Sequence, residues 1–159
     1  MQAIYRGSIM HYEIMDKAAF SVIGREGSTE DGSDFVSRLW QDANGHFSEI
    51  ASSVLYQDGR PLGFWGLMSD FSRSGKPWED DFTKGLYLAG AECRPGSFAE
   101  GWTVWDMPAA AYLKLECENG YPFREGLALL ETLGLRLRGA VLDFTDPKTG
   151  KNYLYYPIQ

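Results

Sequence analysis

The residues of this chain that could do chemistry are mainly aromatic. Its 159 residues include nine Tyr, nine Phe and five Trp, which together make up 14% of the chain. Tyr and Trp combine a large apolar face with a polar tip, which suits a pocket for a flat, hydrophobic molecule. A cation held over such rings gains roughly 0.5–2 kcal/mol. The other interpretation of the same composition is ordinary packing in an aromatic-rich β-sheet core.

Residue patterns for other chemistries are missing from the sequence. There is no nucleophile-elbow serine, no phosphate-binding loop and no Cys–His pair at a catalytic spacing. Cys93 and Cys117 lie far apart, and His11 and His46 stand at unrelated positions. We therefore expect no metal site and no cofactor.

The charge and hydropathy of the sequence limit which binding partners and which cellular location we expect. The net charge is −7 and the chain has no long basic run, so we expect no direct nucleic-acid binding by this chain. It shows neither a signal peptide nor an apolar run of membrane-spanning length, so we expect no membrane association. Two free thiols suit a reducing compartment, and the expected location is the cytoplasm.

The segment 101–118 is the centre of the expected organisation. It forms two β-like runs joined at Met107-Pro108, and the second run alternates apolar and polar residues with a period of two. Residues 105–115, WDMPAAAYLKL, echo residues 14–24, IMDKAAFSVIG, in the order of apolar residue, Asp, alanine run and aromatic residue. A helical pattern and two further β-like runs follow each copy. The sequence therefore predicts a duplicated strand–helix–strand–strand unit.

The elements that would build these units can be placed by periodicity. Ser33 or Asp34 can cap an amphipathic helix that runs to about residue 54, with a break allowed at Gly45. A second helix is expected from Pro122 to about Gly134. The β-like runs are expected at residues 11–14 with 18–23, 62–68, 86–93, 140–145 and 152–158.

The chain length fits one domain of two units. We expect the units at about residues 11–94 and 95–159, and residues 1–10 as a tail, a lost linker or an early start. Trp78 stands out in the polar loop 69–81, where it would either pack onto its own unit or overhang a cleft.

At this point the residues resemble a known family. The chain resembles the GyrI-like family, also described as the effector-binding domain of bacterial AraC- and MerR-type regulators, over about residues 11–159. The shared features are KAAFSVIG (17–24), LW (39–40), YLAGAE (87–92), PAAAY (108–112) and YLYYPI (153–158). The resemblance implies an α+β fold in which two pseudo-twofold units form an antiparallel sheet with two helices on one face. It also implies a ligand cleft between the units, on the other face.

The resemblance also implies what the cleft contains. In relatives that bind lipophilic cations, aromatic walls surround a buried carboxylate that follows the second helix. Asp143, in Leu142-Asp143-Phe144, matches that position, although the family residue is usually Glu. Tyr153 replaces a second acid of the closing strand, so the pocket should be more aromatic and less anionic than in those relatives. Strand alternation then gives the expected ligand-binding set as Trp65, Tyr87, Trp102, Trp105, Tyr112, Asp143, Tyr153 and Tyr155.

Two classes of function follow. The first is a binding module that senses or sequesters a hydrophobic small molecule, which is cationic in some relatives. The second is a cofactor-independent hydrolase of reactive, cyclopropane-bearing molecules, in which Asp143, Glu100 or Glu116 would orient water. A protein-binding role as a topoisomerase inhibitor is a further alternative. We expect no helix-turn-helix segment before the domain, and we expect any DNA-binding partner to be a separate chain; a homodimer stays open.

Overall fold

The computed structural model describes residues 1–5 and 8–159. Its strands are β1 (Gln2–Tyr5), β2 (Ser8–Lys17), β3 (Phe20–Ser28), β4 (Tyr56–Gln57), β5 (Arg60–Pro61), β6 (Phe64–Ser69), β7 (Leu86–Cys93), β8 (Thr103–Met107), β9 (Ala110–Cys117), β10 (Leu142–Thr145) and β11 (Asn152–Ile158). Its helices are α1 (Phe35–Gly45), α2 (Glu79–Phe82) and α3 (Phe123–Thr132), with the short 3₁₀ turns η1 (Thr29–Asp31) and η2 (Phe47–Glu49). Within these described residues, no helix is long and apolar enough to cross a membrane.

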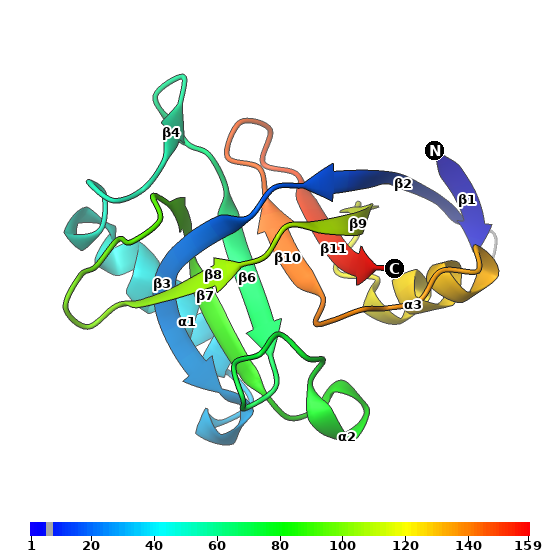
Figure 1. Cartoon of the computed structure of the whole chain (residues 1–159), viewed down its shortest axis with the longest axis horizontal. Helices are drawn as coiled ribbons and strands as arrows, with labels where there is room; N and C mark the ends of the chain where they lie inside the picture. The colour runs from blue at the N-terminus through cyan, green and yellow to red at the C-terminus, as the bar shows by residue number, and fades with distance from the viewer. Residues whose placement is uncertain (6–7) are drawn as a thin grey trace.

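The strands other than β4 and β5 form one antiparallel sheet, in the order β1-β2-β9-β11-β10-β6-β7-β3-β8 (Figure 1). Without β1, this order is symmetric about the β10–β6 pair. The unit β3-α1-β6-β7 on one side corresponds to β9-α3-β10-β11 on the other. The predicted α+β fold with a duplicated strand–helix–strand–strand unit is therefore confirmed.

The two echoed segments lie where the chain passes from one half of the sheet to the other. β2 runs directly into β3 but pairs with β9, and β8 runs directly into β9 but pairs with β3. Each half thus receives its edge strand from the segment that precedes the other half. The aromatic residues that follow the two alanine runs, Phe20 and Tyr112, lie in the same core cluster.

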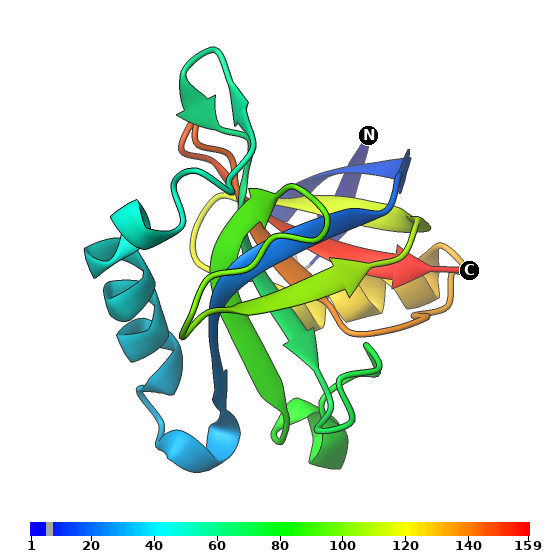
Figure 2. The same ribbon diagram turned by 60° about the vertical axis from the view of Figure 1, so that its left-hand side comes forward.

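The two long helices cover the outer strands of one sheet face. α1 packs on β3 and β7, where its Ala43 lies against Ile23 and Ala91. α3 places Leu129 and Leu130 on residues of β9 and β11. The central strands β6 and β10 lie between the two helices, as Figures 1 and 2 show together. The middle of this face is therefore not covered by a long helix.

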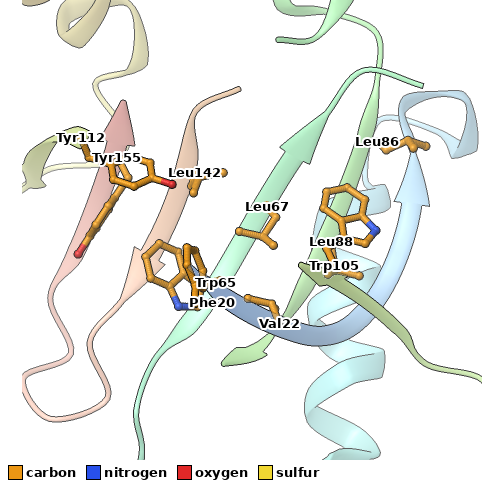
Figure 3. Close-up of a cluster of buried hydrophobic side chains, with 10 residues drawn as sticks. All are labelled: Phe20, Val22, Trp65, Leu67, Leu86, Leu88, Trp105, Tyr112, Leu142 and Tyr155. Atoms are coloured by element: carbon orange, nitrogen blue, oxygen red, sulfur yellow. The ribbon is translucent and has the colours of Figure 1, made fainter. Parts of the chain in front are cut away.

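The opposite face of the sheet is also a hydrophobic core. Its cluster joins Trp105 of β8 to Tyr112 of β9, although these strands stand far apart in the sheet order, so the sheet curls around the cluster. Figure 3 shows Leu67 between a group with Leu142 on one side and a group with Trp105 on the other. Burial of this many large side chains supplies a major part of the apolar stabilisation.

Several boundaries differ from the predicted ones. The N-terminal residues were expected to form a tail, but Gln2–Tyr5 are β1 and Ser8 begins β2, so the described part of that segment belongs to the sheet. The first helix ends at Gly45 instead of continuing to residue 54, in agreement with the weak point expected there. Pro122 is the residue before α3 rather than its first helical residue. β7 and β11 have the predicted bounds.

Candidate functional site

A cavity of about 640 Å³ lies on the helix-covered face, between α1 and α3. Its floor is formed by residues of β6, β7, β10 and β11, the strands at the centre of the sheet. The residues that line it are Ser33, Asp34, Val36, Ser37, Trp40, Met68, Pro77, Trp78, Phe82, Tyr87, Tyr121, Phe123, Ala140, Val141, Asp143 and Leu154. The volume lies in the range of small-molecule sites, and most of the lining is apolar.

Asp143 provides the carboxylate at the floor of this cavity. It points to the helix-covered face because it pairs with Leu154, which packs under α3, and cross-strand partners share a face. Its other strand partner is Gly66 of β6. A Cβ atom on Gly66 would overlap the Tyr87 hydroxyl and the Asp143 carboxylate. Glycine at this position therefore makes the space in which the two polar groups meet.

A chain of hydrogen bonds links α1 to this carboxylate. The Trp40 indole N–H donates to the Tyr87 hydroxyl over 3.0 Å, and that hydroxyl donates to Asp143 Oδ2 over 2.8 Å. Asp143 forms no ion pair with any Lys, Arg or His of the part of the chain that the structure describes. Among the described residues, Asp143 is thus supported by neutral donors without an ion-pair partner, whereas Asp34, the other carboxylate that lines the cavity, pairs with Arg38 at 3.2 Å.

The surroundings shift the pKa values of both groups upward. Desolvation raises the pKa of Asp143 from 3.8 to about 6, although hydrogen bonds from Tyr87 and the Gly66 backbone oppose the rise. Desolvation, with the neighbouring Asp143 charge, raises the pKa of Tyr87 well above 10. Near neutral pH the phenol is therefore a hydrogen-bond donor and the carboxylate is largely ionised. This charge has lost much of its hydration and can be stabilised by a positively charged ligand.

Aromatic side chains form the walls of the cavity. Trp40 comes from α1, Tyr121 from the segment before α3, and Phe123 from the first residue of α3. Trp78 and Phe82 come from residues 70–85, which we call the strap because they connect β6 to β7 across the end of the cavity. The cavity thus presents several ring faces to a ligand within reach of one carboxylate.

The strap is attached to both halves of the sheet. The Trp78 indole N–H donates to the Leu86 carbonyl over 2.8 Å, and the absence of a side chain at Gly85 lets the indole pack there. Phe82 packs edge-on against Phe123 at 5.1 Å between ring centroids, and Arg124 of α3 pairs with Asp81 at 3.1 Å. Trp78 thus packs onto its own unit and also lines the cavity, so the two positions that the sequence offered as alternatives are both occupied by this one side chain.

The structure divides the eight predicted site residues. Only Tyr87 and Asp143 line this cavity, while Trp105 and Tyr112 line another cavity on the opposite face. The remaining four line neither cavity: Trp65, Tyr153 and Tyr155 pack in or against the opposite-face core, and Trp102 donates to Glu49 of the 3₁₀ turn η2. The expectation that all eight line one cleft is therefore corrected, while a ligand-binding role for each stays a prediction.

The division has a physical cause. Tyr87 was placed opposite the helices because Leu86 and Leu88 were expected to meet them. Instead, Leu86 and Leu88 fill the opposite-face core, and α1 packs on the small side chains Ala89 and Ala91. A helix can approach a sheet closely over such small residues. Alternation was predicted correctly, and Trp65, Tyr112, Tyr153 and Tyr155 lie on the face opposite the helices as expected. Tyr87 and Asp143 instead lie on the helix-covered face, where this cavity is.

The glutamates considered as alternative catalytic acids do not line the cavity. Glu116 pairs with Lys151 at 3.1 Å, and Glu100 is exposed before β8. The main contributors that sequence reasoning missed are Trp40, Trp78 and Tyr121. Trp40 had been noted within the shared LW motif, and Trp78 had been expected either to pack onto its own unit or to overhang a cleft. If the cleft had been expected between the helices, Trp40 and Trp78 would have been candidates for its walls.

Comparisons with known proteins agree on the fold. No protein-family model matches the sequence, and a search of curated proteins finds no match. Among solved structures, SAV2435 bound to tetraphenylphosphonium is 14% identical, with 94% of each chain covered and a TM-score of 0.66. The EcmrR C-terminal domain is 10% identical, with 94% of this chain and 98% of that chain covered and a TM-score of 0.65.

A third similar structure is described as a bacterial transcription regulation protein from Staphylococcus aureus. It is 15% identical, with 94% of this chain and 99% of that chain covered and a TM-score of 0.59. At these identities the similarity shows the fold. The fold expected from the resemblance to the GyrI-like family is thus the fold that this chain has.

Proposed function

We propose that this chain binds a hydrophobic, aromatic small molecule that carries a positive charge, in the cavity between α1 and α3. The observation that supports this most is the position of Asp143 at the floor of an aromatic-walled cavity, where it forms no ion pair with any described residue. SAV2435, which has this fold, is seen with tetraphenylphosphonium, a cation of that kind. The chain would then act as an effector-binding or sequestering module.

The size of the electrostatic contribution can be worked out. Two opposite unit charges about 6–8 Å apart attract by roughly 2–3 kcal/mol at an effective dielectric constant of about 20. Removal of the Asp143 charge should therefore weaken cation binding by roughly 30- to 150-fold. Binding of a neutral molecule of similar shape should change little, because the aromatic walls are kept.

The experiment is calorimetric titration of the wild type and Asp143→Asn at pH 7.5. The ligands are tetraphenylphosphonium and the neutral triphenylphosphine oxide. Asp16→Asn is the matched control, since Asp16 is an exposed carboxylate on β2, away from the cavity. Selective loss of cation affinity in Asp143→Asn supports the proposal. Equal affinities in the two variants, or no binding of either ligand to the wild type, would refute it.

One observation favours hydrolysis as a second candidate function. A carboxyl group with a pKa of about 6, bonded to a phenol donor, is suited to general acid–base chemistry near neutral pH. Mass spectrometry of each bound ligand after incubation would separate the two functions. A mass increase of one water that needs Asp143 would indicate an enzyme, whereas an unchanged ligand would indicate a binding module.

A further inference from the structure

The sheet opens at the end of the β6–β10 pair. The two strands pair from Phe64–Gly66 to Asp143–Thr145. Beyond this pairing, the Ala140 N–H donates to the Gly75 carbonyl of the strap over 2.8 Å, and the Asp70 N–H donates to Lys76 of the same strap. The strap therefore inserts between the end of β6 and the segment that leads into β10. We call this opening, bordered by Met68 and Ala140, the breach.

A second cavity, of about 530 Å³, reaches the breach from the opposite face. Its wall includes residues of β8, β9, β10, β11 and the strap, and its apolar part contains Trp105, Met107, Ala110, Tyr112, Leu142 and Pro157. Met68 and Ala140 line both this cavity and the one above Asp143. The two cavities are thus adjacent at Met68 and Ala140.

The distance between the two cavities is short. Leu142 lines the second cavity and Asp143 lines the first, since consecutive residues of a strand point to opposite faces. Ala140 and Asp143 are three residues apart, so their Cα atoms lie at most about 10 Å from each other. Met68 is half-buried, and its unbranched side chain can take several conformations at little cost. A narrow group could therefore pass from one cavity to the other if Met68 rotated.

We infer that the two cavities are the two parts of one binding site and that its ligand is an amphiphilic cation. The cationic aromatic head lies over Asp143, and an apolar tail passes Met68 into the second cavity. This inference rests on the proposed function, because it requires the head to bind in the first cavity.

The charged groups of the second cavity are compatible with an apolar tail. Arg73 is held by Glu26 through two hydrogen bonds of 2.9 and 2.6 Å. Asp106 accepts a hydrogen bond of 2.5 Å from Ser21 and is exposed, as is Arg138 at the other side. These groups stay hydrated or paired when a tail enters, so the tail meets mainly aliphatic and aromatic surface. Each methylene buried there contributes up to about 0.8 kcal/mol, which is about fourfold in affinity.

The test is calorimetric titration with methyl-, butyl- and octyltriphenylphosphonium, which share one head and differ only in the tail. In the wild type, affinity should rise by at least tenfold from the methyl to the octyl compound. Met107→Trp fills the second cavity from its β8 side without touching the first. It should keep the affinity for the methyl compound and remove most of the gain from the tail. Ala110→Phe, from β9, is a second variant of the same kind.

Ile14→Trp is the control, because Ile14 is 46% exposed on β2 and lies outside both cavities. Circular dichroism establishes that each variant is folded. A tail gain that is the same in the wild type and in both filled variants would overturn the inference while leaving the proposed function intact. Failure of the methyl compound to bind the wild type would refute the proposed function itself.

Discussion

The Asp143 carboxylate should destabilise the protein when no ligand is bound. Its pKa is about 6 in the folded chain and 3.8 in the ordinary state, because burial disfavours the charged form. That difference corresponds to roughly 3 kcal/mol. Below about pH 3 the group is largely protonated in both the folded and the unfolded chain, so folding carries no penalty. As the pH rises from about 3 to above 6, the unfolded chain ionises first, and the contribution of Asp143 to stability is progressively lost.

Asp143→Asn should therefore stabilise the ligand-free protein at pH 8. The amide oxygen can still accept the Tyr87 hydrogen bond, so most of the local geometry is kept. We expect a gain of about 1–3 kcal/mol in the free energy of unfolding at pH 8 and little difference at pH 4. The same substitution is expected to abolish selective cation binding, so stability and binding should change in opposite directions.

The assay is urea denaturation of wild type and Asp143→Asn at pH values from 4 to 8, with Asp16→Asn as the control. The difference between wild type and each variant cancels the contributions of the other titrating groups. A variant that is less stable than the wild type at pH 8, with a difference independent of pH, would refute the argument. It would mean that the carboxylate is stabilised in the folded protein rather than strained by its burial.

Three further predictions follow from the same geometry. The affinity for tetraphenylphosphonium should fall about tenfold from pH 7.5 to pH 5 as Asp143 is protonated, because the neighbours Tyr87, Tyr121 and Cys117, whose pKa values are raised by burial, do not titrate in this range. An affinity that calorimetry finds unchanged over this pH range would exclude Asp143 as the cation partner. Tyr87→Phe should destabilise the protein by about 1–3 kcal/mol and raise the pKa of Asp143, because it removes a buried hydrogen bond to that carboxylate. Carbon-detected NMR titration would measure the pKa of Asp143, and an unchanged or lower value would contradict the role of the phenol. Gly66→Ala should lower the free energy of unfolding by about 1–3 kcal/mol and weaken cation binding, because the added methyl group displaces Tyr87 and Asp143. A variant with wild-type stability and affinity would contradict this prediction, and Gly45→Ala, whose added methyl group meets open space, is the control.

The fold could be predicted from the sequence because its signals are local. The two alternating strands at the C-terminal end of each unit, the helix that weakens at Gly45 and the echoed alanine runs each reflect backbone preferences over a few residues. The duplication then follows from their repeated order. The exchange of β2 and β8 between the halves was not predicted, because strand pairing across the whole chain leaves no mark on local periodicity.

The site was predicted only in part for a related reason. Asp143 and Tyr87 were found, but sequence alternation defines two faces without saying which one carries the helices. In this protein both faces are buried, since the sheet curls around its own core, so hydrophobicity does not distinguish them. The walls from Trp40 and Trp78 come from a helix and an irregular strap, whose approach to the sheet depends on tertiary packing.

The most direct test of the central claim is a crystal structure of the wild-type protein with bound tetraphenylphosphonium. We predict that the cation lies between α1 and α3, with its rings against Trp40 and Trp78 and its positive centre within about 8 Å of the Asp143 carboxylate, the range over which the attraction above was worked out. A cation bound only elsewhere on the protein, or a cavity that stays empty at saturating ligand, would contradict the account.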